Sequence, residues 1–394
     1  MSCPVVKTNL VDDEPRQTFE PLLRKIPAQF PLHASIPQED KWQSYITLDL
    51  IVRVLSYTFF HPWVSWVVVL CLRAQYTAYG APEMRIATAW ATLMSALGIW
   101  GLINERLAWG RAREVELEDE VIVVTGGVEG LGGLLARTWG MRGCNVAVLD
   151  KKVGGEGEGR EGEGEQEGVR YYKCDVGDWE SVERAAKRIG EDMGRVTVLV
   201  NNAGMVEGRS ILESSAGDVE RTFRTNTLSH FNTIRAFLPH MLAEKRGTIV
   251  TVSSVLGHLG AANLSAYTAS KAALLAMHSS LVAELSQNPD AEDIKTLLVT
   301  PGQMRTKMFA GLQTPSSFLA PVVEPVDVAK EIITLVERGE SGEIALPLYS
   351  KWVQVMSVLP VGVQMLVRRW SGVDTAMAKA GLVRGKGSVG EKRG

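Results

Sequence analysis

Apolar residues are distributed unevenly along this chain, and their pattern divides it into segments. Residues 1–41 are polar, contain six prolines and show no apolar periodicity, which predicts an extended or poorly ordered lead-in. Two later stretches, Val54 to Leu72 and Ile86 to Ile103, contain no charged side chain. Each approaches the roughly 20 residues that a helix needs to cross the hydrocarbon core of a bilayer. We therefore interpret residues 42–113 as an apolar membrane-anchor region with candidate helices over 54–72 and 86–103.

The residues around these stretches bear on how they would meet a membrane. Aromatic residues lie near their ends, as expected for rings at headgroup level, and basic residues flank the pair on its outer sides. Two complete crossings would place both basic flanks on the cytosolic side and the linker from Arg73 to Arg85 on the other. His61 and Pro62 interrupt the first stretch, so a half-inserted hairpin and a pair of buried helices remain open as alternatives.

From residue 114 onward, short β-branched runs alternate with helical patterns. The expected strands are 121–124, 145–150, 196–200, 248–252 and 295–299, and the expected helices are 131–142, 179–193, 218–244 and 266–286. This alternation predicts an α/β domain over residues 114–343 with a doubly wound, Rossmann-type parallel sheet. Ligands of such folds bind outside the carboxyl ends of the strands.

Two segments depart from this alternation. Residues 154–168 are seven Gly, six Glu, one Arg and one Gln, a composition that predicts a mobile acidic loop where such a fold has a crossover helix. Residues 344–394 form a C-terminal apolar segment and a basic tail. The uncharged part, 352–367, lies between basic residues, so it either sits in a membrane interface or packs on the domain.

Charge and cysteine content exclude several classes of protein. The formal net charge is −3 without clustered basic residues, which argues against a nucleic-acid partner. The Gly/Glu segment alone carries six Glu against one Arg, so the rest of the chain is slightly basic. Four scattered cysteines show neither a CxxC pair nor a metal-ligand spacing, so we expect no metal site and no disulfide framework.

The first expected strand runs into a glycine-rich turn, residues 125–132 with the sequence Thr-Gly-Gly-Val-Glu-Gly-Leu-Gly. Glycines let the backbone approach a pyrophosphate, whose charge meets the free N–H groups and dipole of the following helix. Asp150 ends the next strand, where its carboxylate can accept hydrogen bonds from ribose hydroxyls and would repel a 2′-phosphate. Lys151 and Lys152 could offset that repulsion. The pattern favours NAD as the cofactor and leaves NADP open.

Three residues farther along carry candidate acid–base chemistry. Tyr267 and Lys271 stand four positions apart in an expected helix and so share one face. A lysine ammonium beside a phenol favours the phenolate and lowers its pKa toward the range of a general acid or base. Ser254 follows a strand and could hydrogen-bond a carbonyl or alkoxide oxygen. Taken singly, each residue also fits a packing, surface or capping role; their combination is what points to catalysis.

In these motifs the sequence resembles the short-chain dehydrogenase/reductase family over about residues 118–340. The matching residues are Thr125, Gly126, Gly130, Leu131 and Gly132 in the turn; Cys174, Asp175 and Val176; Asn201, Asn202, Ala203 and Gly204; Ser254, Tyr267 and Lys271; and Pro301, Gly302 and Thr306. The resemblance implies that Tyr267 is the acid or base and that Ser254 orients the substrate oxygen. It implies that Lys271 holds the nicotinamide ribose and that Asn226 holds a water.

The same resemblance implies a cofactor contact for each remaining motif. Asp175, with Val176 beside it, is expected at the adenine. Asn202, Ala203 and Gly204 are expected to line the cofactor, and Thr306, in the segment that Pro301 and Gly302 open, to meet the nicotinamide amide. Dimerisation through the long helices that carry Asn226 and Tyr267 is expected from the family only.

Within the family, the apolar anchor before the turn and the late run Ile344-Ala345-Leu346-Pro347 resemble the membrane-bound retinol and 17β-hydroxysteroid dehydrogenase branch. That implies a lipophilic alcohol or ketone as substrate, on the endoplasmic reticulum or on lipid droplets, with a cytosolic catalytic domain. The loop after Pro301 supplies apolar candidates for the substrate site: Met304, Met308, Phe309, Leu312, Phe318 and Leu319. The alternatives are an NADPH-dependent ketoreductase and a non-catalytic, cofactor-binding scaffold on a lipid surface.

Overall fold

A computed structural model describes residues 47–153, 168–309, 316, 318–356 and 358–374 of the chain. The expected lead-in over residues 1–41 lies outside the described residues, as do Leu312 and the basic tail. The acidic segment predicted as a mobile loop also lies outside them, apart from Gly168.

A seven-stranded parallel sheet forms the centre of the domain, in the order β3-β2-β1-β4-β5-β6-β7. The strands are β1 (Val121–Thr125), β2 (Asn145–Asp150), β3 (Val169–Lys173), β4 (Val198–Asn201), β5 (Arg246–Val252), β6 (Asp293–Val299) and β7 (Gly342–Ile344). The chain builds outward from β1 to β3 and then returns to the other side of β1 for β4. This reversal creates a crevice at the carboxyl ends of β1 and β4, where doubly wound folds bind their ligands.

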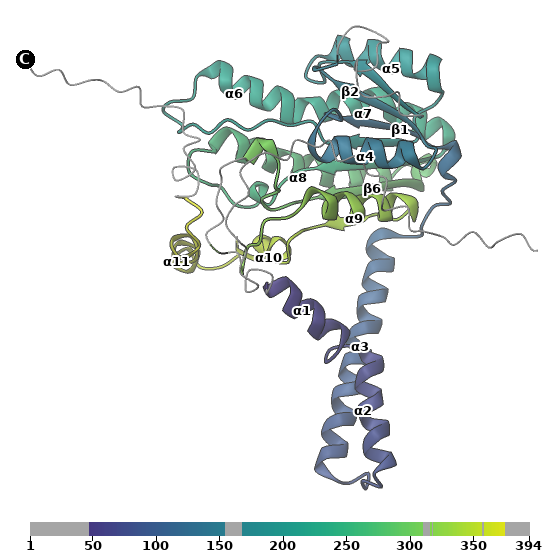
Figure 1. Cartoon of the computed structure of the whole chain (residues 1–394), viewed down its shortest axis with the longest axis vertical. Helices are drawn as coiled ribbons and strands as arrows, with labels where there is room; N and C mark the ends of the chain where they lie inside the picture. Colours follow the sequence, from purple (N-terminus) through teal and green to yellow (C-terminus); the bar gives the residue numbers. More distant parts are fainter. Residues whose placement is uncertain (1–46, 154–167, 310–315, 317, 357, 375–394) are drawn as a thin grey trace, which may run out of the picture. The chain divides into compact units, whose positions relative to one another are not determined.

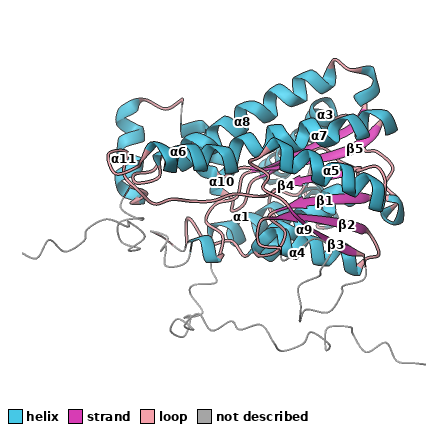
Figure 2. Ribbon diagram, turned by 90° about the horizontal axis from the view of Figure 1, so that it is seen from above, coloured by secondary structure: helices cyan, strands magenta, loops and turns pink. Residues whose placement is uncertain are grey.

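Helices cover both faces of the sheet, as Figures 1 and 2 show. The domain helices are α4 (Gly130–Met141), α5 (Trp179–Met193), α6 (Ala216–Phe223), α7 (Ser229–Glu244), α8 (Ser265–Ser286) and α9 (Pro325–Glu337). One core cluster packs α4 and α9 on one face, around the fully buried Trp139 and Ile332. The other packs α5, α7 and the end of α8 on the opposite face, around Ile189 and Phe237.

The expected elements agree with the structure where the periodicity is simple, and β2 and α5 have the predicted bounds. The helix expected over 218–244 is instead α6 and α7 joined by a π-helical turn, Arg224–Leu228. A residue added to one helical turn in this way often marks a functional site. Helix α9 was not among the expected elements, although Val328, Ile332 and Val336 bury one face of it.

Three helices precede the domain: α1 (Leu48–Tyr57), α2 (Pro62–Ala74) and α3 (Pro82–Trp109). The prediction of one helix over 54–72 is wrong, because the stretch is divided between α1 and α2, which are bent by 52°. Pro62 is the first residue of α2, where its missing N–H costs nothing, whereas inside a longer helix it would remove a hydrogen bond. The stretch 86–103 lies within α3, the described helix long and apolar enough to cross a membrane by itself.

Helices α2 and α3 pack against each other as a hairpin (Figure 1). Val69, Met84 and Ala91 form its small apolar contact, and the indole N–H of Trp66 donates to the Ser95 hydroxyl at 2.9 Å. Most of the remaining surface is apolar and exposed, and Trp100, for example, is 71% exposed. The alternative of a pair of buried helices therefore does not fit residues 62–109, all of which the structure describes.

The linker from α3 to β1 is fixed by a buried ion pair. The Arg113 guanidinium donates to both Glu120 carboxylate oxygens, at 2.7 and 3.1 Å, and to the Thr248 hydroxyl at 3.2 Å. Both charged side chains are 1% exposed. The Arg113 amide also donates to the Gly339 carbonyl at 2.9 Å, so the linker is held at β1, β5 and the end of α9 together.

Two short helices follow β7: α10 (Tyr349–Met356) and α11 (Val361–Ser371). Pro360 caps α11 and separates the two, which explains why the uncharged segment 352–367 does not form one helix. Trp352 and Trp370 are 66% and 75% exposed, and no residue of α11, which is described over its whole length, is buried.

Candidate active site

The glycine-rich turn between β1 and α4 has the backbone that its glycines allow. Gly126 and Gly130 adopt φ of +64° and +62°, a region that favours glycine. A Cβ on Gly132 would lie 2.5 Å from the Gly126 carbonyl oxygen and 2.6 Å from the Asn202 amide nitrogen, so the first turn of α4 packs directly on its neighbours. Glycine at 126 and 130 thus permits the left-handed backbone, and glycine at 132 permits the close approach.

Thr125 joins this turn to the segment after β4. Its hydroxyl oxygen accepts the amide N–H groups of Asn202 and Ala203, both at 3.0 Å. The Asn202 side chain donates back to the Thr125 and Gly126 carbonyls, at 3.1 and 3.2 Å. Residues 77 positions apart therefore form one rigid floor at the crevice between β1 and β4.

This floor fits the pyrophosphate and ribose of a dinucleotide. Among the described residues, the N-cap Glu129 makes no side-chain capping bond, so the first N–H groups of α4, including that of Leu131, stay available to a phosphate. Asp150 accepts the Val128 amide at 3.3 Å and the Lys152 amide at 3.0 Å. These bonds hold the Asp150 carboxylate beside the turn, where ribose hydroxyls would reach it.

The two lysines after Asp150 are engaged by other carboxylates. Lys151 pairs with Asp175 at 2.9 Å, and Lys152 lies 3.4 Å from Glu129. Lys307 also lies 3.4 Å from Glu129. Burial would raise the pKa of Glu129, but the charges of Lys152 and Lys307 outweigh it and hold that pKa below its usual value. The turn therefore carries compensated charge rather than free cations.

The expected catalytic residues come together at the carboxyl end of β5. Ser254 follows this strand, and Tyr267 and Lys271 lie on one face of α8; all three are buried. The Ser254 hydroxyl lies near the Tyr267 phenol and acts to lower its pKa. The Lys271 ammonium donates to the Val252 carbonyl at 2.9 Å and lies 6.0 Å from the centre of the Tyr267 ring.

Burial is the main influence on the pKa values of Tyr267 and Lys271. It raises the pKa of Tyr267 to about 12, although the nearby Ser254 hydroxyl acts in the opposite direction. Burial also lowers the pKa of Lys271 to about 8. The expected lowering of the phenol pKa is therefore not found in this arrangement, because desolvation disfavours the charged form of each group.

Asn226 lies in the π-helical turn and is fully buried. Its side chain accepts the Met205 amide at 2.8 Å and donates to the Met205 carbonyl and the Ser270 hydroxyl, both at 3.0 Å. A Cβ on Gly204 would lie 3.6 Å from Asn226 and 3.7 Å from Lys271. Asn226 thus connects the segment after β4 to α8. No sequence signal indicates its paired hydrogen bonds to Met205.

The segment after β6, here called the post-β6 loop, closes the other side of the site; its described residues are 300–309, 316 and 318–324. The Pro301 carbonyl accepts the Val255 amide at 3.0 Å, next to Ser254. Thr306 is joined to Met304 and Phe309 through its backbone. The Phe309 ring meets Tyr267 edge-on, with the ring centres 6.3 Å apart.

The surroundings of Tyr267 are apolar. Its ring and Leu264 form a buried cluster against which four partly buried apolar side chains pack. These are Val206, Leu256, Ala261 and Phe309. The adenine end is different: Val176 is buried, and Asp175 is half-buried beside Lys151. The site is therefore polar toward the expected adenosine and apolar around the acid–base residue.

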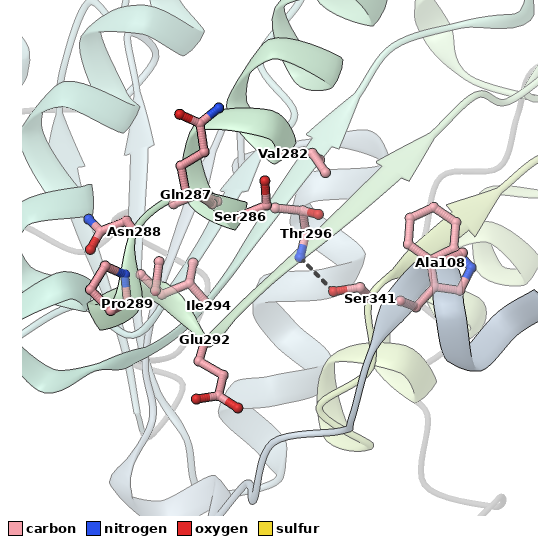
Figure 3. Close-up of a pocket in the computed structure, with 13 residues that line it drawn as sticks. Ala108, Val282, Ser286, Gln287, Asn288, Pro289, Glu292, Ile294, Thr296 and Ser341 are labelled. Carbon is pink, nitrogen blue, oxygen red and sulfur yellow. Dashed lines mark hydrogen bonds between the residues drawn. The ribbon is translucent and has the colours of Figure 1, made fainter.

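A cavity of about 570 Å³ lies away from these residues, at the amino end of β6 (Figure 3). Trp109, Gln287 and Ile294 line it, and the Ser341 hydroxyl accepts the Thr296 amide at 3.1 Å within it. The strands are parallel, so this cavity lies at the amino ends of the strands and the catalytic residues lie at their carboxyl ends. It has no part in the site.

The rate should depend on the charge of Lys271. Above a pH of about 8 this residue loses its proton, because burial has lowered its pKa. The positive charge 6.0 Å from the centre of the Tyr267 ring, which would stabilise a phenolate as it forms during turnover, is lost with it. We expect kcat/KM to fall as the pH rises through this range. Lys271→Arg keeps a cation at every pH of the profile and should move the falling limb to higher pH, at a lower maximal rate. Identical limbs in both pH profiles would contradict this role.

The sequence is also similar to those of known proteins. A family model described as short chain dehydrogenase matches residues 120–316. Human retinol dehydrogenase 10 is 31% identical over 309 residues, which cover 71% of this chain and 90% of that protein. Mouse epidermal retinol dehydrogenase 2 is 32% identical over 257 residues, 64% of this chain and 82% of the relative.

Solved structures show the same architecture. A short chain dehydrogenase from Burkholderia cenocepacia, in complex with NADP, has a TM-score of 0.53 and 24% sequence identity. The match covers 65% of this chain and 99% of that one. At this identity the likeness concerns the fold.

Proposed function

Because the chain belongs to the short-chain dehydrogenase/reductase family and is an oxidoreductase of its retinol dehydrogenase branch, we propose that it transfers a hydride between NAD(H) and a lipophilic alcohol or ketone at a membrane surface. Retinoid, steroid and long-chain lipid alcohols all belong to this class of substrate. The single observation that carries the proposal is the apolar cluster around the buried Tyr267.

That cluster suits an apolar substrate for a simple reason. A ligand that buries hydrocarbon against Leu264 and Phe309 gains about 25 cal/mol per Å² of apolar surface removed from water. A small polar alcohol has little apolar surface to bury there, so it would gain little binding free energy from these side chains. Two relatives in the comparison are named as retinol dehydrogenases, which agrees with an apolar alcohol.

The chain's own residues would divide the work as follows. Tyr267 exchanges a proton with the substrate oxygen, and Ser254, which lies near the phenol, orients that oxygen. Lys271 carries a positive charge near the phenol, 6.0 Å from the centre of the Tyr267 ring, and would hold the nicotinamide ribose when the cofactor is bound. Asn226 fixes the Gly204–Met205 backbone and, by family resemblance, holds a water of the proton relay. The nicotinamide cofactor, when bound, supplies the acceptor or donor of hydride.

The turn after β1 supports NAD as the preferred cofactor. Asp150 faces the position of the adenosine ribose and would repel a 2′-phosphate. Lys151 and Lys152, which could have neutralised that phosphate, are paired with Asp175 and Glu129. The carboxylate is thus the group that a cofactor would meet first.

Replacing Asp150 should therefore change cofactor choice. Asp150→Ala removes acceptors for two ribose hydroxyls, and hydrogen bonds to charged groups contribute about 1.5–3 kcal/mol each. We expect kcat/KM with NAD to fall at least tenfold and kcat/KM with NADP to rise. Asp178→Ala, at the N-cap of α5, serves as the control and should leave kcat/KM unchanged with both NAD and NADP. An unaltered ratio of NAD to NADP in Asp150→Ala would refute this assignment.

The N-terminal helices support membrane association. Helix α3 is long and apolar enough to cross a bilayer, and α1 with α2 would make a second, broken span. Only 11% of the α3 apolar window is buried, so a core role within a soluble domain leaves most of that surface in water. We propose the endoplasmic reticulum or lipid droplets as the location, with the catalytic domain in the cytosol.

The test of the proposed function is turnover by the purified full chain in detergent or phosphatidylcholine vesicles. Retinol, a hydroxysteroid and a long-chain alcohol would each be assayed with NAD and with NADP, beside short water-soluble alcohols. Higher kcat/KM for the lipophilic alcohols with NAD supports the proposal. Preference for the short alcohols, or recovery of the full chain in the soluble fraction without detergent, would overturn the corresponding part.

A further inference from the structure

The amino end of α1 is bonded to two segments that lead to the catalytic residues. The Leu48 amide donates to the Phe318 carbonyl in the post-β6 loop, at 3.0 Å. The Leu348 amide, 299 positions away in the chain, donates to Asp49 Oδ2 at 2.8 Å. The second oxygen of Asp49, Oδ1, is buried and has no hydrogen-bond partner among the described residues. A carboxylate in the first turn of an apolar helix thus faces the domain rather than solvent.

Residues 346–349 contact the segment that leads to the site. The Leu346 carbonyl accepts the Gly302 amide at 2.6 Å, and a Cβ on Gly302 would lie 2.7 Å from the Tyr349 hydroxyl. Residues 346–349 therefore pack against the start of the post-β6 loop. The same loop carries Phe309, whose ring contacts Tyr267. Through Leu348, Leu346 and residues 302–309, the first turn of α1 is thus connected to the acid–base residue.

The other face of α1 is apolar and uncovered. Leu50, Ile51 and Val54 are 45%, 39% and 52% exposed, and no residue of α1, described from end to end, is buried. Helix α1 continues into the apolar α2–α3 hairpin through residues 58–61. This continuity with the proposed membrane region argues for lipid as the surface that covers α1.

The helices that follow Leu348 share this character. Helix α10 begins at Tyr349 and exposes Trp352, and α11 exposes Trp370. Lys351 and Arg369 are exposed beside them, whereas the Arg368 guanidinium is paired with Asp374. Exposed tryptophans next to exposed basic side chains suit the headgroup layer of an anionic bilayer.

We propose that Asp49 is a positioning residue that fastens α1 to residues 346–349, so that contact of α1, α10 and α11 with an anionic lipid surface holds residues 302–309 in place beside Tyr267 for a substrate arriving from that surface. The inference rests on the proposed function for its substrate, but its physical content is a lipid-dependent ordering of residues 302–309.

Hydrogen–deuterium exchange of the full chain tests that ordering without any turnover. Vesicles of phosphatidylcholine and phosphatidylserine should slow exchange in peptides covering residues 303–309 and 346–349. Asp49→Ala should abolish the slowing, whereas Asp49→Asn, which keeps an acceptor oxygen for the Leu348 amide, should retain most of it. Glu83→Ala is the matched control, because Glu83 is an exposed acidic residue in the first turn of α3. Equal slowing in wild type and Asp49→Ala, or none in wild type, would overturn the proposal.

Kinetics provide the second measurement. Asp49→Ala should raise KM for a vesicle-borne long-chain alcohol about tenfold, the effect of one lost hydrogen bond to a charged group, with kcat little changed. KM for a short soluble alcohol should not change, and Asp49→Asn should restore most of the difference. A parallel loss with both alcohols would indicate a general structural role and refute the positioning role. Absence of turnover with every alcohol would refute the proposed function, while the exchange result would still decide the role of Asp49.

Discussion

Replacement of Tyr267 by Phe is expected to lower kcat for alcohol oxidation about 10²–10⁴-fold, the usual contribution of a positioned general acid or base. The change removes one oxygen and leaves the ring in its contacts with Leu264 and Phe309. Fold and cofactor binding should therefore be kept. The measurement is steady-state turnover beside an NADH-binding titration. A variant with wild-type kcat would eliminate Tyr267 as the residue that exchanges the proton.

A second tyrosine offers the matched control. Tyr172 is also buried, and its hydroxyl donates to Asp192 at 2.9 Å, on the face of the sheet that holds α5. Tyr172→Phe removes the same atom from a buried tyrosine outside the site. We expect it to reduce stability slightly and to leave kcat unchanged.

Removal of Arg113 is expected to produce the largest loss of stability. Arg113→Met would leave the Glu120 carboxylate buried without its counter-charge, and breaking a buried ion pair in this way costs about 3–5 kcal/mol. It would also remove the hydrogen bond to Thr248 on β5. Thermal unfolding in detergent, followed by circular dichroism, measures the effect as a lower Tm.

An exposed pair provides the comparison for Arg113. Arg142 pairs with Glu337 at the surface, where its side chain is 45% exposed, so Arg142→Ala should cost less than about 1 kcal/mol. The double variant Arg113→Met with Glu120→Leu should regain much of the lost stability, because no unpaired charge is left buried. Equal Tm values for Arg113→Met and Arg142→Ala would show that the buried pair contributes little.

The parts of the site that could be predicted are those encoded in consecutive residues. The turn over 125–132 follows from its glycines, and the shared face of Tyr267 and Lys271 follows from helical spacing. Even the parallel arrangement of β1 and β4 is implied by alternating strands and helices. In these motifs the residues that carry the chemistry also determine the local backbone structure.

The parts that could not be predicted depend on burial or on distant partners. Arg113 is the last residue of the predicted anchor region, 42–113, and nothing near it in sequence indicates that Glu120 and Thr248 will enclose it. The pKa of Tyr267 was expected to be lowered by Lys271, but desolvation raises it. The bond between Asp49 and Leu348 joins residues too far apart for any spacing rule.

The length of α3 has a consequence for where the chain can reside. At 1.5 Å per residue, the uncharged stretch from Ile86 to Ile103 measures roughly 27 Å along the helix axis. The hydrocarbon layer of the endoplasmic reticulum is also about 27 Å thick, whereas that of the sterol-rich plasma membrane is about 32–33 Å. A spanning α3 would match the thinner bilayer and would strain the thicker one. Hydrophobic thickness would then favour the proposed location of a spanning α3 over a thicker membrane.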